Sequence, residues 1–128
     1  MGWRLCRQLN NPLMENKMTS FNQSKEVKIE EIEDGIKRQI MGYTDDLMLV
    51  RVFFKKGAIG YTHNHIHHQI SYVESGKFEV EIDNKKKILK EGDAFTVESH
   101  QEHGAVCLED GILIDTFSPK REDFLISK

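Results

Sequence analysis

Four of the chain's six histidines crowd into a short segment between Tyr61 and Gln69. On a β-strand, His63 and His65 would project from one face about 6–7 Å apart, a spacing that suits two ligands of one ion. His67 shares this alternation if the strand continues unbroken. Neutral imidazole is a ligand suited to Zn, Fe, Ni, Cu or Mn. The segment therefore predicts a transition-metal site, the alternative being a surface stretch that binds metal adventitiously.

A distant histidine favours the metal site over adventitious binding. His103 follows an expected strand that Gly92 opens and Val97 ends. A β-barrel can fold this part of the chain back onto the first cluster. We therefore predict that His63, His65 and His103 converge.

The elements that must position these residues are predicted to be short strands. Alternating or apolar runs bounded by Gly, Asn, Asp and Ser indicate strands. The expected strands cover residues around 27–32, 47–54, 69–74, 77–83, 85–90, 93–97, 104–108 and 112–117. The strand over 47–54 is apolar on both faces, which predicts burial between two layers. Residues 121–126 form either one helical turn or an edge segment. Short strands with regular turns favour an all-β sandwich or barrel.

Composition excludes several classes of function. The chain has 18 basic and 21 acidic residues and a formal net charge of −3, which argues against nucleic-acid binding. No apolar run approaches the roughly 20 residues that span a bilayer, and no signal peptide is expected. Cys6 and Cys107 do not make a disulfide framework and are expected to be free thiols in a reducing cytoplasm.

The chain length predicts one domain. Residues 1–25 are polar and irregular and are expected to form a disordered or loosely attached extension. Residues 26–128 would then form the barrel.

Residues 36–126 resemble the cupins. The first cupin motif is a glycine, five residues, His-x-His, three or four residues, an acid or amide, six residues and a glycine. It matches Gly57, His63, His65, Gln69 and Gly76 in register. The resemblance implies an all-β double-stranded β-helix, or jelly-roll, barrel of the RmlC-like type.

The second cupin motif presents the last metal ligand. It is a glycine, five residues, Pro-x-Gly, two residues and a histidine, and it matches Gly92 and His103. Glu98 occupies the proline position and His100 the glycine position, so the turn departs from the family pattern. The resemblance implies that His63, His65, Gln69 and His103 hold one divalent ion such as Ni, Zn, Fe or Mn. His67 and His68 remain rivals for the fourth place, and His100 is expected to serve the turn.

The C-terminal segment from Ile114 to Phe124 is similar to the tail of small single-domain cupins associated with pectin and alginate breakdown. Those cupins convert 4,5-unsaturated monouronates into linear ketonised sugars. The resemblance implies that Asp115, Phe117 and Arg121 line the pocket beside the metal.

The chemistry of these three residues agrees with that role. Asp115 and Phe117 share parity on a strand, so both can face the barrel interior. Desolvation would raise the pKa of Asp115 and suit it to acid–base catalysis. Arg121 can bind a uronate carboxylate through two hydrogen bonds, and Phe117 offers a flat wall to a sugar ring. The alternatives are a surface Asp–Arg pair and a core phenylalanine.

We therefore expect an isomerase-type enzyme that acts on an anionic sugar. A metal-dependent dioxygenase and a non-catalytic binding module for a sugar or small ligand are the competing functions. Small cupins often pair through their sheets, so we also expect a homodimer without nucleic-acid or membrane partners.

Overall fold

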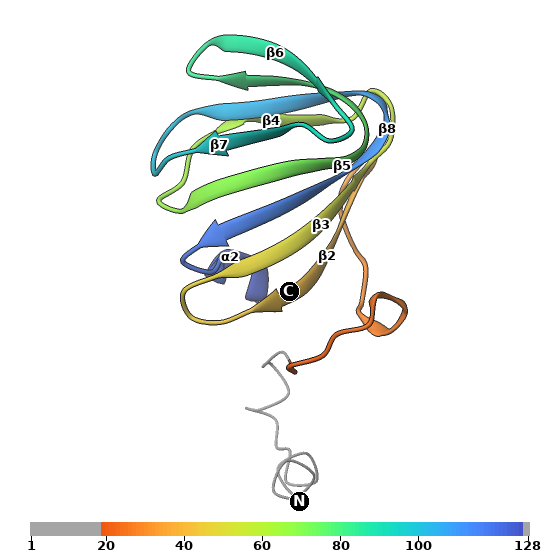
Figure 1. The fold of residues 1–128 in the computed structure, drawn as a ribbon, viewed down its shortest axis with the longest axis vertical. Helices are drawn as coiled ribbons and strands as arrows, with labels where there is room; N and C mark the ends of the chain where they lie inside the picture. Colours follow the sequence, from red (N-terminus) through yellow and green to blue (C-terminus); the bar gives the residue numbers. More distant parts are fainter. Residues whose placement is uncertain (1–18, 127–128) are drawn as a thin grey trace, which may run out of the picture.

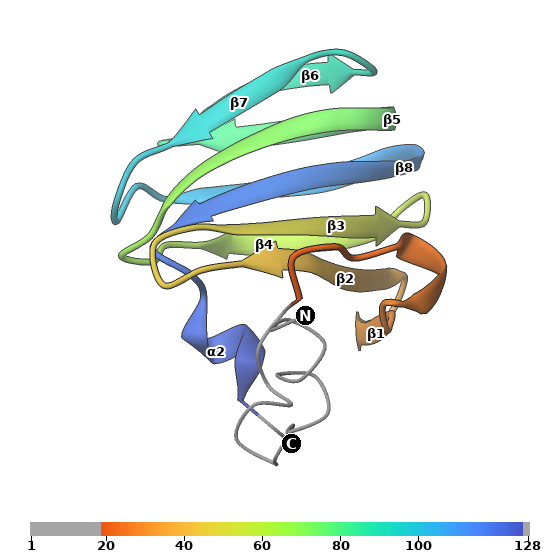
Figure 2. The same ribbon diagram turned by 60° about the horizontal axis from the view of Figure 1, so that its bottom comes forward.

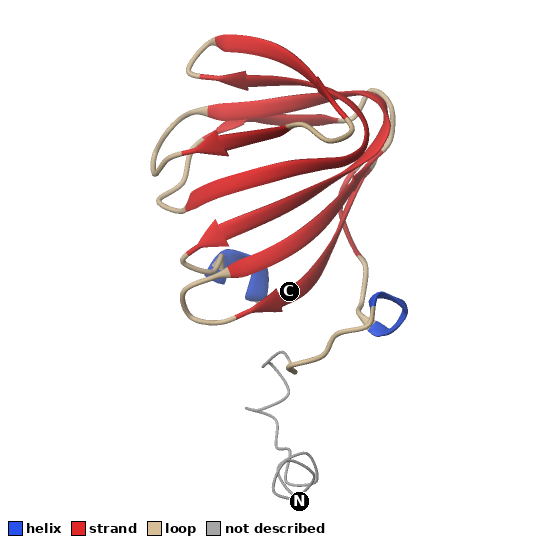
Figure 3. Cartoon of the chain, viewed as in Figure 1, coloured by secondary structure: helices blue, strands red, loops and turns tan. Residues whose placement is uncertain are grey.

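The computed structural model describes residues 19–126, and almost all of them lie in strands or the turns between strands (Figures 1 and 3). Two short helical segments flank the strands, η2 (Ser24–Glu26) and α2 (Glu122–Leu125). The strands are β1 (Glu30–Glu33), β2 (Ile36–Tyr43), β3 (Met48–Phe54), β4 (Ile59–His63), β5 (His68–Ile82), β6 (Lys85–Lys90), β7 (Ala94–Val97) and β8 (His103–Ser118).

The strands form one antiparallel sheet that folds over into two layers. The order is β1-β2-β3-β8-β5-β6, with β4 paired to β8 and β7 paired to β5. The first part of β8 pairs with β4, whereas its last part pairs with β3. The long strands β5 and β8 lie side by side through the bend (Figure 1). The prediction of an all-β barrel is confirmed.

The prediction that residues 69–74 and 77–83 form two separate strands is wrong, because one strand continues through the bend. Apart from Asp83, which lies in the following turn, they belong to the single strand β5, and residues 104–108 and 112–117 likewise belong to β8. Gly76 has a φ of 86°, and a Cβ there would lie 2.5 Å from the carbonyl oxygen of Asp110. Glycine therefore lets the two backbones approach closely and bend together with shifted register, where we had expected chain ends.

Two further strands differ from the prediction. Residues 47–54 are not buried on both faces, since Met48 and Val50 are buried but Leu49 is 38% exposed. No layer covers the outer face of β3 among the described residues. Strand β2 was not predicted at all, although it joins β1 to β3.

The interior holds two apolar clusters. One surrounds Phe78 and includes Phe54, whose ring meets that of Phe78 edge to face. The other contains Met48, Val50 and Phe117. The helix α2 packs Phe124 against this second cluster, so the helical alternative for residues 121–126 is confirmed. Both α2 and β1 lie below β2 in the view of Figure 2.

The N-terminal extension predicted for residues 1–25 falls largely outside the described residues, and its boundary stays a prediction. At its end, the buried side chain of Gln39 donates hydrogen bonds to the carbonyl oxygens of Ser24 and Val27. These bonds attach η2 to β2. No helix in residues 19–126 is long and apolar enough to cross a membrane.

Candidate metal centre

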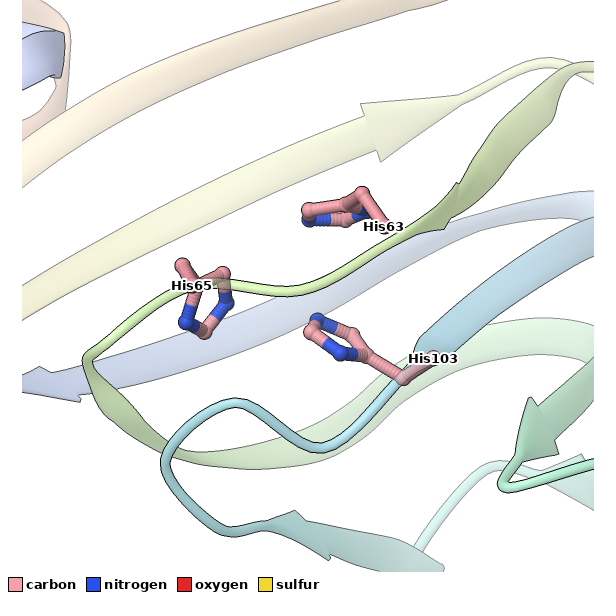
Figure 4. Close-up of side chains that lie close together, drawn as sticks. All are labelled: His63, His65 and His103. Atoms are coloured by element: carbon pink, nitrogen blue, oxygen red, sulfur yellow. The ribbon is translucent and has the colours of Figure 1, made fainter.

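Three histidines from two separate segments of the chain converge in the structure (Figure 4). His63 ends β4, and its partner in the register is His103, the first residue of β8. His65 lies in the loop after β4, so the prediction that His63 and His65 share one strand is wrong. The loop nevertheless returns His65 to the site, because its carbonyl oxygen accepts a hydrogen bond from the backbone N–H of His100. The nearest ring nitrogens of the three residues lie within 4.8 Å of one another.

The hydrogen bonds of the three imidazoles leave their Nε2 atoms available as ligands. Each Nδ1 lies within 2.9 Å of a backbone carbonyl oxygen, those of Tyr61, His67 and Gln101. A carbonyl oxygen only accepts, so each Nδ1 carries the proton and each neutral Nε2 presents a lone pair. The Nε2 of His103 is buried and has no hydrogen-bond partner. This arrangement fits a metal ion, because metal-binding histidines usually donate their second N–H in this way.

Burial keeps two of these histidines neutral. It lowers the pKa of His65 to about 4 and also lowers that of His103, and the nearby charge of Arg121 acts in the same direction. Metal ions bind the unprotonated imidazole. The site is therefore prepared for an ion at neutral pH.

Gln69 brings an oxygen to the same point. Its Oε1 lies 3.1 Å from His65 Nε2, and its Nε2 donates to Ser71 Oγ over 2.8 Å. The Ser71 hydroxyl donates in turn to Asp115 Oδ1 over 2.6 Å. Because the Ser71 hydroxyl donates its proton to Asp115, it accepts from the Gln69 amide nitrogen, and the Gln69 amide oxygen must then point toward His65. Two hydrogen-bond acceptors, Gln69 Oε1 and His65 Nε2, therefore face each other. Two ligands about 2.1 Å from one ion lie about 3 Å apart, so a shared cation resolves this repulsion.

The rival ligands lie elsewhere. His68 accepts a hydrogen bond from the backbone N–H of Ser99. His67 is outside the group of three ring nitrogens within 4.8 Å. His100 occupies the turn with a φ of 66°, which suits the glycine position of the second cupin motif. Among the three candidates for the fourth ligand, Gln69, His67 and His68, the geometry favours Gln69.

A cavity of about 210 Å³ is lined by His63 and His103 of this cluster and extends into the barrel. Asp115, Phe117 and Arg121 all line it, as predicted from their parity and from the tail motif. The sequence did not single out two other lining residues, Arg38 and Phe124. Arg38 shares parity with Ile36 and Ile40, a weak signal of an inward face in an unpredicted strand.

Asp115 is the acid–base candidate of this cavity. Burial raises the pKa of its carboxyl to about 6, although the Ser71 hydrogen bond and the Arg121 charge both favour the ionised form. A carboxyl that titrates close to neutrality can both accept and return a proton. Sequence reasoning missed Ser71, whose only signal was its shared parity with Gln69.

Arg121 is buried, and part of its guanidinium is hydrogen-bonded within the protein. Its Nε and Nη2 donate to the two carboxylate oxygens of Asp123 over 3.0 and 2.8 Å. Its guanidinium also lies 4.2 Å from the ring centroid of Phe124 and 5.0 Å from that of Phe117. The Nη1 side of the guanidinium therefore remains for an anion in the cavity.

The two-layered barrel and its histidine cluster define a small cupin. The family model described as "Cupin domain" matches residues 50–115. The chain is 59% identical over 98 residues to the pectin degradation protein KdgF of Dickeya dadantii, a match that covers 75% of this chain and 89% of that protein. The chain belongs to the cupin family.

Two solved structures agree with this assignment. An RmlC-like cupin from Shewanella frigidimarina is 50% identical, with a TM-score of 0.83 over 85% of this chain and 98% of that one. The structure of KdgF from Halomonas sp. is 47% identical, with a TM-score of 0.80 over 84% of this chain and 99% of that one. The predicted resemblance to the pectin-degradation cupins is confirmed.

We predict that one equivalent of divalent transition metal binds and that His103→Ala abolishes this binding, because the substitution removes a buried Nε2 ligand. Gln69→Ala should weaken affinity by at least about 10–100-fold, the loss that follows when only an outer partner of a ligand is removed. His67→Ala is the matched control and should retain the metal. Metal content after dialysis and competition with a chelator measure all three. Loss of metal in His67→Ala with retention in Gln69→Ala would reverse the assignment of the fourth ligand.

Proposed function

We propose that the protein is a metal-dependent cupin enzyme that converts 4,5-unsaturated monouronates into linear ketonised sugars by ring opening and tautomerisation. The observation that carries this proposal is the desolvated Asp115, which shares one cavity with the histidine cluster and Arg121. The similarity to a pectin degradation protein supports the choice of substrate. Such a reaction is an isomerisation and needs neither oxygen nor an organic cofactor.

We assign the metal ligands as His63, His65, His103 and Gln69, and the ion as Ni, Zn, Fe or Mn. All four ligands are neutral, so the site keeps the full charge of a divalent cation and favours an anionic substrate. When bound, such an ion supplies Lewis-acid polarisation of sugar oxygens.

Asp115 moves the protons in this proposal. As a carboxylate it takes the proton of the C1 hydroxyl while the bond from C1 to the ring oxygen breaks, which leaves an aldehyde at C1. The ring oxygen gains a proton and becomes the C5 enol. Loss of that proton and protonation of C4 then give the C5 ketone, and the atoms balance as an isomerisation requires. The Ser71 hydroxyl holds the carboxylate in place for these transfers.

Two further residues position the sugar. Arg121 lines the cavity, and its Nη1, which donates to no described residue, is suited to the uronate carboxylate. Phe117 is buried beneath Arg121 and offers its ring to the apolar face of the sugar.

The turnover test uses metal-replete protein, a 4,5-unsaturated monouronate and no oxygen, with the vinyl proton followed by NMR. We expect accelerated loss of the signal in the wild type and none in chelator-treated protein. Asp115→Asn should retain the metal but lose about 10²–10⁴-fold in rate, whereas the exposed Asp46→Asn should behave as wild type. An unchanged signal from wild-type protein with one equivalent of metal would refute this substrate, and a requirement for oxygen would indicate a dioxygenase.

The hydrogen bond from Ser71 predicts a pH effect. It stabilises the ionised carboxyl and so lowers the pKa of Asp115. Because the base is active when ionised, kcat/KM should rise with pH, and Ser71→Ala should move this rise about one unit higher, equivalent to about 1.4 kcal/mol. The pH profiles of both proteins with the same metal measure the shift. A shift to lower pH in Ser71→Ala would contradict the role of Asp115 as base.

We also propose a cytoplasmic homodimer. The free buried thiol of Cys107 supports a reducing compartment. The uncovered outer face of the sheet supports self-association, since Leu49, Ile70 and Tyr72 surround Thr116 there and are 38–54% exposed.

The dimer is tested by light scattering after size-exclusion chromatography. Wild-type protein should show twice the mass of one chain, and Tyr72→Glu should show a monomer because a charge enters the apolar face. Ile88→Lys, at a position on β6 that is also exposed, is the control and should remain dimeric. A monomeric wild type would contradict the dimer.

A further inference from the structure

Arg38 is a second buried cation in the cavity. It lies on β2, is only 8% exposed and lines the same space as the histidines, Asp115 and Arg121. A buried guanidinium is costly unless charged or polar partners compensate it. The partners of Arg38 therefore indicate what the residue is for.

The hydrogen bonds of Arg38 leave part of its guanidinium unused. Its Nε donates to Glu30 Oε1 over 3.1 Å, and its Nη2 makes a long contact of 3.4 Å with the carbonyl oxygen of Phe124. No described residue accepts a hydrogen bond from its Nη1. The Glu30 side chain is 36% exposed, so solvent screens the one carboxylate that pairs with this cation.

Arg38 and Arg121 meet at the same aromatic ring. Their Cζ atoms lie 4.0 and 4.2 Å from the ring centroid of Phe124. Each is paired with an acid, Glu30 or Asp123, that does not line the cavity, whereas both guanidinium groups do. The cavity lining therefore contains two arginines, and neither of their Nη1 groups donates a hydrogen bond to a described residue.

We propose that Arg38 is a specificity-determining residue that binds the substrate carboxylate together with Arg121, and this inference rests on the function proposed above. Because Asp123 occupies the Nε–Nη2 side of Arg121, that residue alone does not offer the side-on pair of bonds that arginine forms best with carboxylates. Arg38, on β2, supplies the hydrogen-bond donors that Arg121 lacks. The cavity thereby selects a sugar acid over the neutral sugar of the same shape.

A purely structural role for Arg38 makes a different prediction. The Glu30 ion pair and the Phe124 contact connect β1, β2 and α2, so Arg38 would then act by holding these elements together. Glu30→Gln breaks the ion pair but leaves the guanidinium in place. This substitution separates the two roles.

The experiment measures binding of D-galacturonate and D-galactose to metal-replete protein by calorimetry, together with kcat and KM for the unsaturated monouronate. Arg38→Gln should weaken galacturonate binding and raise KM about 10–100-fold, the scale of losing a hydrogen bond to a charged group, with kcat within about threefold of wild type. Galactose binding should not change. Glu30→Gln should stay within about twofold of wild type in every measurement, and thermal unfolding checks that each variant is folded.

Three outcomes would overturn the inference. They are an unchanged KM in Arg38→Gln, an equal loss of galacturonate and galactose binding, or an equal effect of Glu30→Gln. Failure of the proposed function is recognised separately, because wild-type protein would then bind galacturonate in an Arg38-dependent way yet leave the vinyl proton signal unchanged.

Discussion

The pairing of β5 with β8 is the constraint on which the site depends. Ser71 stands opposite Asp115 and Gln69 opposite Phe117 in this register. The pairing therefore joins the proposed fourth ligand, the serine and the acid–base residue into one hydrogen-bonded chain across two strands. A slip of one residue would turn Asp115 to the outer face of the sheet. The bend at Gly76 and the shifted register around it let the same two strands also carry His103 to the histidine cluster.

Local patterns predicted the parts of the site that depend on neighbours in sequence. The alternation of Asp115 and Phe117 placed both in the cavity, and Asp83 and Asn84 form the turn that separates β5 from β6, with φ of 49° and 69°. The cupin spacing brought His103 to the correct partners. These features follow from the two-residue period of a strand and from motif spacing, which a sequence displays directly.

Contacts between distant segments could not be predicted in the same way. Arg38 lies in a strand whose mixed polar pattern gave little sign of burial, and its contact with Phe124 spans most of the chain. The loop position of His65 was also missed, because a histidine on every second residue looks the same in a strand and in a loop that returns to the site. The amide orientation of Gln69 follows only from the donors and acceptors that tertiary packing assembles around it.

Charge divides the cavity into two functional ends. The proposed ligands, three neutral imidazoles and an amide oxygen, would leave a divalent cation uncompensated, and two guanidinium groups packed against Phe124 add positive charge to the cavity lining. Asp115 supplies the one carboxyl among the described residues that line this cavity, and burial raises its pKa to about 6. An anionic substrate would offset both positive regions and leave the carboxyl next to the sugar. That charge balance would favour a sugar acid over a neutral sugar and would accommodate a partly buried carboxyl whose pKa is close to neutrality.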